Sequence, residues 1–182
     1  MSNIFKAKYL CWIDCEMTGL NPMSDQILEI CLVLTDHSFN IIDQYETVIH
    51  CAEDRLLAMD DWNRQQHSKS GLWSEVIAST VDSITAQDLI IAWLKNYMVA
   101  GEAILCGNSV YQDRFFLKMH MPKLDQFFHY RLIDVSTLKQ LIPIWFPAFE
   151  GYKKLTNAHR ARQDILESIA ELKYCRDFLG AL

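Results

Sequence analysis

Long apolar runs are missing from the 182-residue sequence, and so is the apolar segment with a small-residue cleavage site that marks a secretory signal. These absences argue against a membrane-spanning helix and predict a cytoplasmic protein. Repeats, low-complexity tracts and linkers are also missing. With 51% hydrophobic and 22% charged residues, the composition predicts one globular domain over residues 1–182 with a sizeable core.

Paired cysteine motifs are absent too. The six cysteines are scattered through apolar stretches without any Cys-x-x-Cys pair. This pattern favours reduced cysteines packed as small hydrophobic residues over a zinc site or a disulfide framework.

Positive charge is in deficit, because 17 lysines and arginines stand against 23 acids and give a net charge of −6. A protein that holds a long nucleic acid mainly by neutralising phosphates needs a basic surface. The deficit therefore argues against that class. It is compatible with a short phosphorylated substrate that metal ions and a few arginines hold.

The order of strand and helix patterns predicts an α/β fold. Residues 8–15, 26–36 and 41–50 are expected to form three antiparallel strands, and shorter segments at 103–107 and 131–136 two more. Along the chain the predicted strands come first, and helices that alternate with two further strands follow. This order predicts a mixed sheet covered by helices. Thr85 and Asp88 are expected to cap one helix. Helical patterns cover about 53–59, 61–69, 72–79, 85–98, 110–121, 137–145 and 160–178.

The first predicted strand contains two acids among apolar residues, in the stretch CWIDCE. Asp14 and Glu16 are two positions apart, so their side chains point to the same face of the strand. Neighbouring carboxylates beside an apolar core repel each other and lose hydration. They need a partner, and a cation is the obvious one.

Two more acids stand where they can join this pair. Asp113 follows a buried strand at the carboxyl end of the predicted sheet, and Asp164 begins the last helix. Each of them alone is equally compatible with a helix cap or a solvated charge. His159 shares a site with Asp164 only if it precedes the helix, since residues five apart do not share a helix face. Carboxylates without cysteine ligands suit Mg²⁺ or Mn²⁺, and a neutral histidine can take a proton from water.

Five blocks of sequence in this order resemble the oligoribonuclease family within the DEDDh 3′-to-5′ exonucleases. The resemblance runs from about residue 9 to residue 178. The blocks are WIDCEMTGL, MDDWN, CGNSVYQDRFFL, FHYRLIDVSTLK and AHRARQDILESIAELKY.

The resemblance implies a ribonuclease H-like fold and a site that binds two Mg²⁺ or Mn²⁺ ions. In it Asp14, Glu16, Asp113 and Asp164 are metal ligands, and His159 is the general base. The implied reaction is hydrolysis of very short RNAs, down to dinucleotides, to 5′-mononucleotides. A homodimer is implied as well.

The resemblance also implies substrate contacts. The matching residues are Leu20 as a wedge between bases, Trp62 as a stacking ring, Ser109, Arg131 and Ser136 as a cap on the 5′ phosphate, and Tyr130 with Arg131 reaching the neighbouring subunit's site. From the residues alone, Trp62 is also compatible with a helix-face core position and Arg131 with a surface salt bridge. Arg162 and Tyr111 depart from the family's usual apolar and small residues.

Two alternative functions share these features. One is a DEDDh exonuclease that acts on longer DNA or RNA, which keeps the acids but lacks the phosphate cap. The other is a non-catalytic dimeric scaffold with the same fold. Retention of all four acids and His159 counts against the scaffold.

Overall fold

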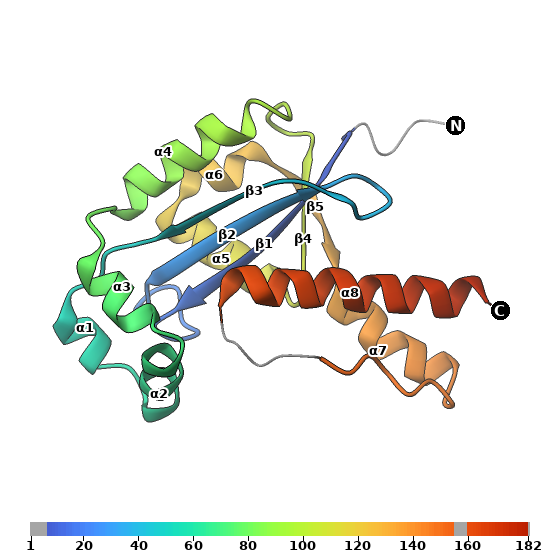
Figure 1. Cartoon of the computed structure of the whole chain (residues 1–182). Coiled ribbons are helices and arrows are strands. Elements are labelled where there is room, and N and C mark those ends of the chain that lie inside the picture. Colours follow the sequence, from blue (N-terminus) through green and yellow to red (C-terminus); the bar gives the residue numbers. More distant parts are fainter. Residues whose placement is uncertain (1–6, 155–159, 182) are drawn as a thin grey trace.

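The computed structural model describes residues 7–154 and 160–181, and at its centre lies a mixed sheet (Figure 1). The strands in chain order are β1 (Leu10–Met17), β2 (Ile27–Thr35), β3 (Ile41–Val48), β4 (Ala103–Gly107) and β5 (Phe128–Asp134). Across the sheet they follow the order β3-β2-β1-β4-β5. The pairs β1–β2 and β2–β3 are antiparallel, whereas β1–β4 and β4–β5 are parallel. The predicted α/β fold with three antiparallel strands first is confirmed.

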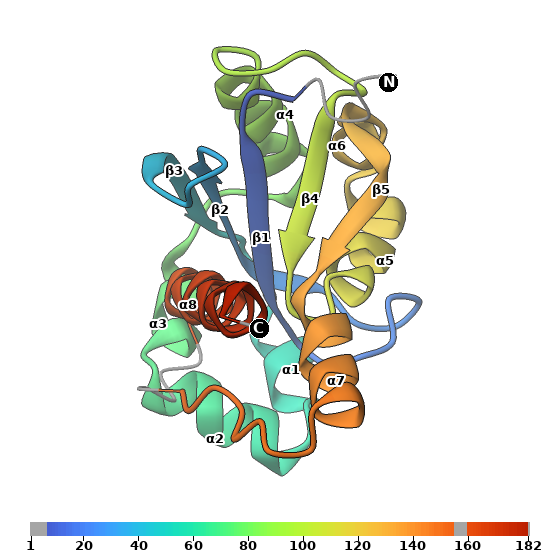
Figure 2. The same ribbon diagram turned by 90° about the vertical axis from the view of Figure 1, so that its right-hand side faces the viewer.

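Helices enclose both faces of this sheet (Figure 2). The longest, α8, crosses one face, while α4, α5 and α6 cover the other, and α1 to α3 gather beyond the end of β1 (Figures 1 and 2). Among the described residues the helices are α1 (Glu53–Leu57), α2 (Asp61–Lys69), α3 (Leu72–Ala78), α4 (Ser83–Leu94), α5 (Tyr111–His120), α6 (Pro122–Phe127), α7 (Val135–Trp145) and α8 (Ala161–Gly180).

The alternation of side chains along β1 decides which face each acid meets. Ile13 and Cys15 belong to the core beneath α4, α5 and α6, whereas Trp12 belongs to the core beneath α8. Side chains two apart on a strand share a face. Asp14 and Glu16 continue the row of Trp12, so they lie on the α8 side of the sheet.

Strands β1 and β4 pair only over a short stretch. Their register runs from Leu10 opposite Ile104 to Trp12 opposite Cys106, while β1 continues to pair with β2 as far as Met17. A Cβ atom on Gly107 would lie 2.9 Å from the carbonyl oxygen of Ile13, so glycine permits the close approach there. Beyond this point the second half of β1 has no strand on its β4 side within the described sheet.

The interior agrees with the expectation for the cysteines. All six are buried and free of disulfides. Burial raises the pKa of the Cys11 and Cys15 thiols well above the ordinary value, which keeps them protonated and unreactive. Within the part of the chain that the structure describes, no helix is both long and apolar enough to cross a bilayer.

The cap of α4 differs from the predicted one. Asp82, not Thr85, is the N-cap residue, and its side chain accepts a hydrogen bond of 2.7 Å from the Thr85 backbone N–H. An ionised carboxylate next to the helix N-terminus satisfies the free N–H and interacts favourably with the helix dipole. The predicted capping box at Thr85 and Asp88 was therefore wrong by one turn.

Two prolines lie within helices. Pro122 does end α5, but it also occupies the first turn of α6, where its missing N–H costs nothing, and this short helix was not predicted. Pro143 lies inside α7, which runs to Trp145. The last strand begins at Phe128, three residues earlier than expected.

Candidate active site

Three acids from two distant parts of the chain meet at one end of the sheet. Asp14 and Glu16 come from β1, and Asp164 comes from the first turn of α8. One carboxylate oxygen from each lies within 4.8 Å of those of the others. Three oxygen donors this close together match the ligands that a hard divalent cation such as Mg²⁺ or Mn²⁺ prefers. The donor set therefore fits the implied metals.

Asp113 borders this cluster from the first turn of α5. Its side chain is 6% exposed, and its Oδ1 accepts a hydrogen bond of 2.9 Å from the backbone N–H of Cys15. That N–H lies in the half of β1 that has lost β4 as a neighbour. The carboxylate satisfies a buried backbone donor, and it holds α5 against the strand between Asp14 and Glu16.

Burial and mutual repulsion disfavour the charged forms of these acids. The pKa of Asp14 lies well above its ordinary value because of burial first, then the charges of Asp113 and Glu16. Burial, then the charge of Asp164, raises the pKa of Glu16 to about 7. Burial raises the pKa of Asp113 to about 7, although the Cys15 hydrogen bond opposes the shift. A bound cation would relieve both the repulsion and the desolvation of the ionised forms.

Lys154 supplies a positive charge at the edge of the cluster. Its Nζ lies 3.0 Å from Asp164 Oδ1. Burial lowers the pKa of Lys154, but the hydrogen bond and the charge of Asp164 outweigh burial and raise it overall. This ammonium partly neutralises the acid that the last helix contributes.

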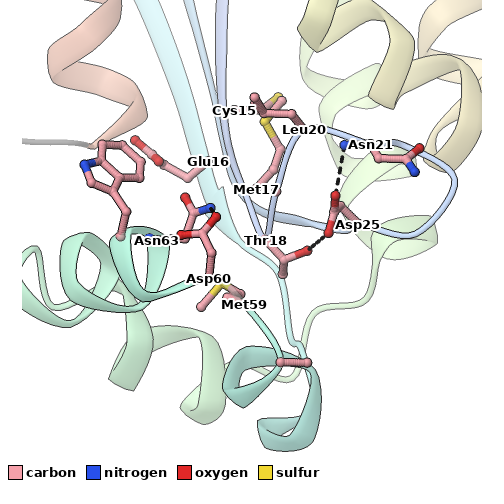
Figure 3. A pocket seen from close by; sticks show the side chains of 13 residues that line it. Cys15, Glu16, Met17, Thr18, Leu20, Asn21, Asp25, Met59, Asp60 and Asn63 are labelled. Carbon is pink, nitrogen blue, oxygen red and sulfur yellow. Dashed lines mark hydrogen bonds between the residues drawn. The ribbon is translucent and has the colours of Figure 1, made fainter.

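A cleft of about 940 Å³ opens beside the cluster between the end of β1, the loop after it and α2 (Figure 3). Glu16 and Leu20 line it from the β1 side, and Trp62 and Asn63 line it from α2. Leu20 is 79% exposed and Trp62 57%. Trp62 is therefore not a core residue, and both residues reach the surface at this cleft.

The loop that presents Leu20 is built around Asp25. The Asp25 carboxylate accepts hydrogen bonds from the Thr18 hydroxyl at 3.1 Å and from the Asn21 backbone N–H at 2.9 Å (Figure 3). A Cβ atom on Gly19 would lie 2.6 Å from that carboxylate, so glycine leaves room for it. Gln112 on α5 donates a hydrogen bond of 2.6 Å to the Leu20 carbonyl and fixes the loop from the other side.

Ser109 and Ser136 meet at a single carboxylate. Asp134, the N-cap of α7, accepts hydrogen bonds at Oδ1 from the backbone N–H of Ser109 at 2.9 Å and of Ser136 at 3.0 Å. The Ser136 hydroxyl also donates to this oxygen. Ser109 adopts a φ of 50°, in the left-handed region that few non-glycine residues enter. The structure thus brings two of the predicted substrate contacts together.

Tyr130 and Arg131 are not joined to the acids of their own chain by any bond among the described residues. Tyr130 on β5 is 73% exposed, and it stacks on His129 with ring centroids 4.4 Å apart. The Arg131 guanidinium lies 5.4 Å from the Tyr130 ring centroid. Tyr111 contributes to the same surface, where it borders a shallow pocket with Phe115 and Tyr130.

His159, the expected general base, falls outside the described residues. The last helix begins at Ala161 without a side-chain cap from Arg160. Arg162 donates a hydrogen bond of 2.9 Å to the Gln44 side chain on β3, so this departure from the family pattern turns toward the sheet edge.

Two residues near the acids were missed from the sequence. His67 on α2 is buried, with Nε2 3.0 Å from the Met17 carbonyl and Nδ1 3.9 Å from Glu16. Glu29 on β2 lies directly opposite Glu16 in the register and is fully buried. Glu29 carries the same signal that drew attention to Asp14, an acid within an apolar strand. His67 carries no such signal, because a polar helix gives no hint of its burial.

Comparisons with known proteins agree with this geometry. Residues 11–172 match the family model described as exonuclease, RNase_T. Proteins named oligoribonuclease from Shewanella sp. strain ANA-3 and Shewanella oneidensis are each 49% identical over 93% of this chain and 94% of their own. One from Shewanella putrefaciens is 50% identical over 92% of this chain.

Solved structures of exonuclease I share the fold. The zinc-bound Escherichia coli enzyme with single-stranded DNA superimposes with a TM-score of 0.71 over 97% of this chain, at 13% identity. The enzyme from Methylocaldum szegediense gives a TM-score of 0.65 at 16% identity. This chain spans less than half the length of those proteins, 43% and 40% respectively.

Proposed function

Because this chain belongs to the oligoribonuclease family of exonucleases, we propose that it is a 3′-to-5′ exoribonuclease that hydrolyses very short RNAs to 5′-mononucleotides. The observation that carries the proposal is the convergence of Asp14, Glu16 and Asp164 within 4.8 Å, with Asp113 alongside, at the mouth of a cleft with two exposed apolar side chains. The proposed exonuclease domain is residues 1–182, in the cytoplasm.

The acids are the proposed ligands of two Mg²⁺ or Mn²⁺ ions. When bound, such ions supply an activated water and stabilise the charge that develops on the phosphodiester oxygens. Asp14 and Glu16 hold their oxygens on a rigid strand, and Asp164 closes the set from α8. Histidine as a residue type titrates near neutrality when unperturbed, and His159 is the proposed acceptor of the proton from the attacking water.

Leu20 and Trp62 are the proposed contacts to the two bases. Both are exposed on opposite sides of the same cleft, and an aromatic plane stacks on any base for about 1–3 kcal/mol. This type of contact reads no sequence, which suits an enzyme that degrades mixed fragments.

Ser109, Ser136 and Arg131 are the proposed cap on the 5′ phosphate. Two of them already share the Asp134 carboxylate. The Ser136 hydroxyl donates to Asp134, so it must rotate before it donates to a phosphate. A closed cap leaves no path for a longer strand, and this limits the substrate to very few nucleotides.

Tyr130 and Arg131 are proposed to act across a homodimer, with Tyr130 reaching the catalytic centre of the second copy. Their side chains point to solvent, and Tyr111, Phe115 and Met119 add to an exposed apolar surface on the neighbouring α5. Large exposed aromatic surfaces favour association. Sedimentation velocity at assay concentrations tests this part, and a monomer that retains full activity contradicts it.

The substrate proposal is tested by comparing three RNAs with Mn²⁺ present: a 5′-phosphorylated dinucleotide, the same dinucleotide with a 5′ hydroxyl, and a twenty-mer. The phosphorylated dinucleotide should be cleaved with a kcat/KM about 10-fold or more above that of its hydroxyl form, since hydrogen bonds to a charged group contribute about 1.5–3 kcal/mol. A preference for the twenty-mer supports the longer-substrate alternative. No cleavage with Mg²⁺ or Mn²⁺ supports the scaffold.

A further inference from the structure

Glu29 is a fully buried acid, and both of its carboxylate oxygens accept hydrogen bonds from the start of α8. Its Oε1 accepts hydrogen bonds from Arg160 Nε at 2.9 Å and Nη2 at 2.6 Å. Its Oε2 accepts from the backbone N–H of Ala161 at 3.0 Å. The first free N–H of the helix is therefore capped by a residue 132 positions away, on a neighbouring strand.

Arg160 extends this contact to a third element. It donates to both carboxylate oxygens of Glu75 on α3, from Nη1 at 3.1 Å and Nη2 at 2.8 Å. It also donates to the Ser70 carbonyl at 3.4 Å, just before α3. We call Glu29, Arg160 and Glu75 the α8 clamp. It fixes the beginning of the helix to β2 and α3 at once.

The clamp lies next to the proposed metal ligands on both sides. Glu29 stands opposite Glu16 on paired strands. The backbone N–H of Asp164 donates to the Arg160 carbonyl at 3.1 Å, which makes Asp164 part of the turn that the clamp begins. A shift of Arg160 would therefore move the Asp164 carboxylate relative to Asp14 and Glu16.

Stability alone does not explain such an arrangement. A buried charge pair costs desolvation that its attraction often only balances, and an apolar pair of similar size packs as well. A guanidinium and a carboxylate joined by two hydrogen bonds hold each other in one plane. Such a contact therefore defines the position of both groups.

We propose that the α8 clamp is a positioning device that sets where α8 begins, so that Asp164 completes the divalent-cation site with Asp14 and Glu16. Glu29 and Arg160 are positioning residues that touch neither ion nor substrate. The inference rests on the proposed function insofar as it takes these acids to be metal ligands. Metal affinity would then depend on Glu29 and Arg160 as well as on the acids that bind the ion.

Two variants test position in different ways. A glutamine amide cannot accept from Ala161 N–H and from Arg160 through both of its atoms, so Glu29→Gln removes a contact at the start of α8. It also removes a negative charge opposite Glu16, and both losses should weaken cation binding. Arg160→Lys keeps the positive charge but removes the planar two-pronged contact.

The experiment measures Mn²⁺ binding by titration calorimetry, without RNA, on the full chain and on three variants. Glu29→Gln and Arg160→Lys should each weaken Mn²⁺ about 10-fold or more, the usual loss when a residue that orients a metal ligand is removed. Arg162→Lys, on the same turn with an exposed contact to Gln44, is the matched control and should stay within about 2-fold. Amide hydrogen exchange should rise selectively at residues 161–165 in the first two variants.

The outcomes separate this inference from the proposed reaction. Unchanged or tighter Mn²⁺ binding in Glu29→Gln, or unchanged binding and exchange in Arg160→Lys, overturns the positioning role. If Glu29→Gln does not fold, Arg160→Lys decides alone. A wild-type chain that binds Mn²⁺ but leaves RNA intact overturns the reaction while the clamp is still tested. A wild-type chain that binds no Mn²⁺ overturns both.

Discussion

Asp14, Glu16 and Asp113 are held by the sheet, whereas Asp164 is brought to them by a helix that polar side chains attach. On the sheet side, strand register fixes Asp14 and Glu16, and a hydrogen bond to the strand backbone fixes Asp113. On the helix side, the Asp164 side chain is 25% exposed and pairs with Lys154. Strand contacts therefore fix the three carboxylates on the sheet side, whereas the position of Asp164 depends on side-chain contacts of α8.

This difference shows how one fold supplies both rigidity and a way to respond to a cation. Backbone pairing with β2 resists displacement of the half of β1 that carries the acids, and the Asp113 carboxylate bonds the other side of this strand at Cys15. Side-chain contacts at a helix start depend on a few charged groups. We therefore expect changes on the sheet side to remove activity and changes on the helix side to tune it.

The largest effect should come from Asp113→Asn on the sheet side. The amide oxygen can still accept from the Cys15 N–H, so the fold should persist, while an anionic ligand is lost. Hydrolysis of the dinucleotide should fall by about 10³-fold, since a metal clamp contributes several kcal/mol to transition-state stabilisation and about 1.4 kcal/mol equals tenfold. Single-turnover rates with saturating Mn²⁺ measure this, with circular dichroism as the control for folding. A loss below tenfold would contradict the assignment.

A second effect, somewhat smaller, concerns the stability of the metal-free chain. The pKa of Glu16 is raised from 4.5 to about 7. The folded state therefore binds more protons than the unfolded state between these values, and the free energy of unfolding should fall as pH rises through this window, by up to about 3 kcal/mol for Glu16 alone. The contribution of Glu16 to the free energy of unfolding is fully present below pH 4.5 and is lost above pH 7.

Urea unfolding in a chelator at pH 5, 6, 7 and 8 measures that fall. Saturating Mg²⁺ should oppose it, because the ion stabilises the ionised acids and binds more tightly as they lose protons. Glu16→Gln should flatten the profile in the chelator. A metal-free stability that rises steadily over this range would show that the sheet-side acids are not under electrostatic strain.

The smallest effect should come from the helix side, in Lys154→Met. The ammonium 3.0 Å from Asp164 competes with a cation for that carboxylate. Because the pair is partly exposed, it contributes about 0–1 kcal/mol, and Mn²⁺ affinity should rise by no more than about 5-fold. Lys153→Met, an exposed neighbouring lysine, is the control. Weaker Mn²⁺ binding in Lys154→Met would mean that the lysine supports the site instead of competing with an ion.

The sheet-side half was readable from the sequence because it depends on local rules. Alternation along β1 predicts that Asp14 and Glu16 share a face, and the end of a buried strand predicts the place of Asp113. The meander, the buried cysteines and the last helix follow from equally local patterns. Asp164 was recognisable as an acid near a helix start, although its meeting with β1 came only from family resemblance.

The contacts that attach the helix side were not readable, because they join residues far apart in the chain. Glu29 and Arg160 are separated by 131 positions. No local sequence pattern indicates that Glu29 caps the helix that begins after Arg160. The contact between Asp134 and Ser109 was missed for the same reason. In the sequence Asp134 is recognisable only as a helix cap, and Ser109 reaches it from a different loop. The α4 cap was wrong for a different reason: Asp82 and Thr85 are both of a residue type that caps helices and lie within one turn, and the earlier residue is the N-cap.

Asp113 gives one of its two oxygens to the backbone of β1. A rotation that withdrew Oδ1 would leave the Cys15 N–H without its partner beside the core. The backbone of β1 therefore sets the orientation in which the Asp113 carboxylate meets any ligand, so that part of the geometry of the site is determined by a main-chain hydrogen bond.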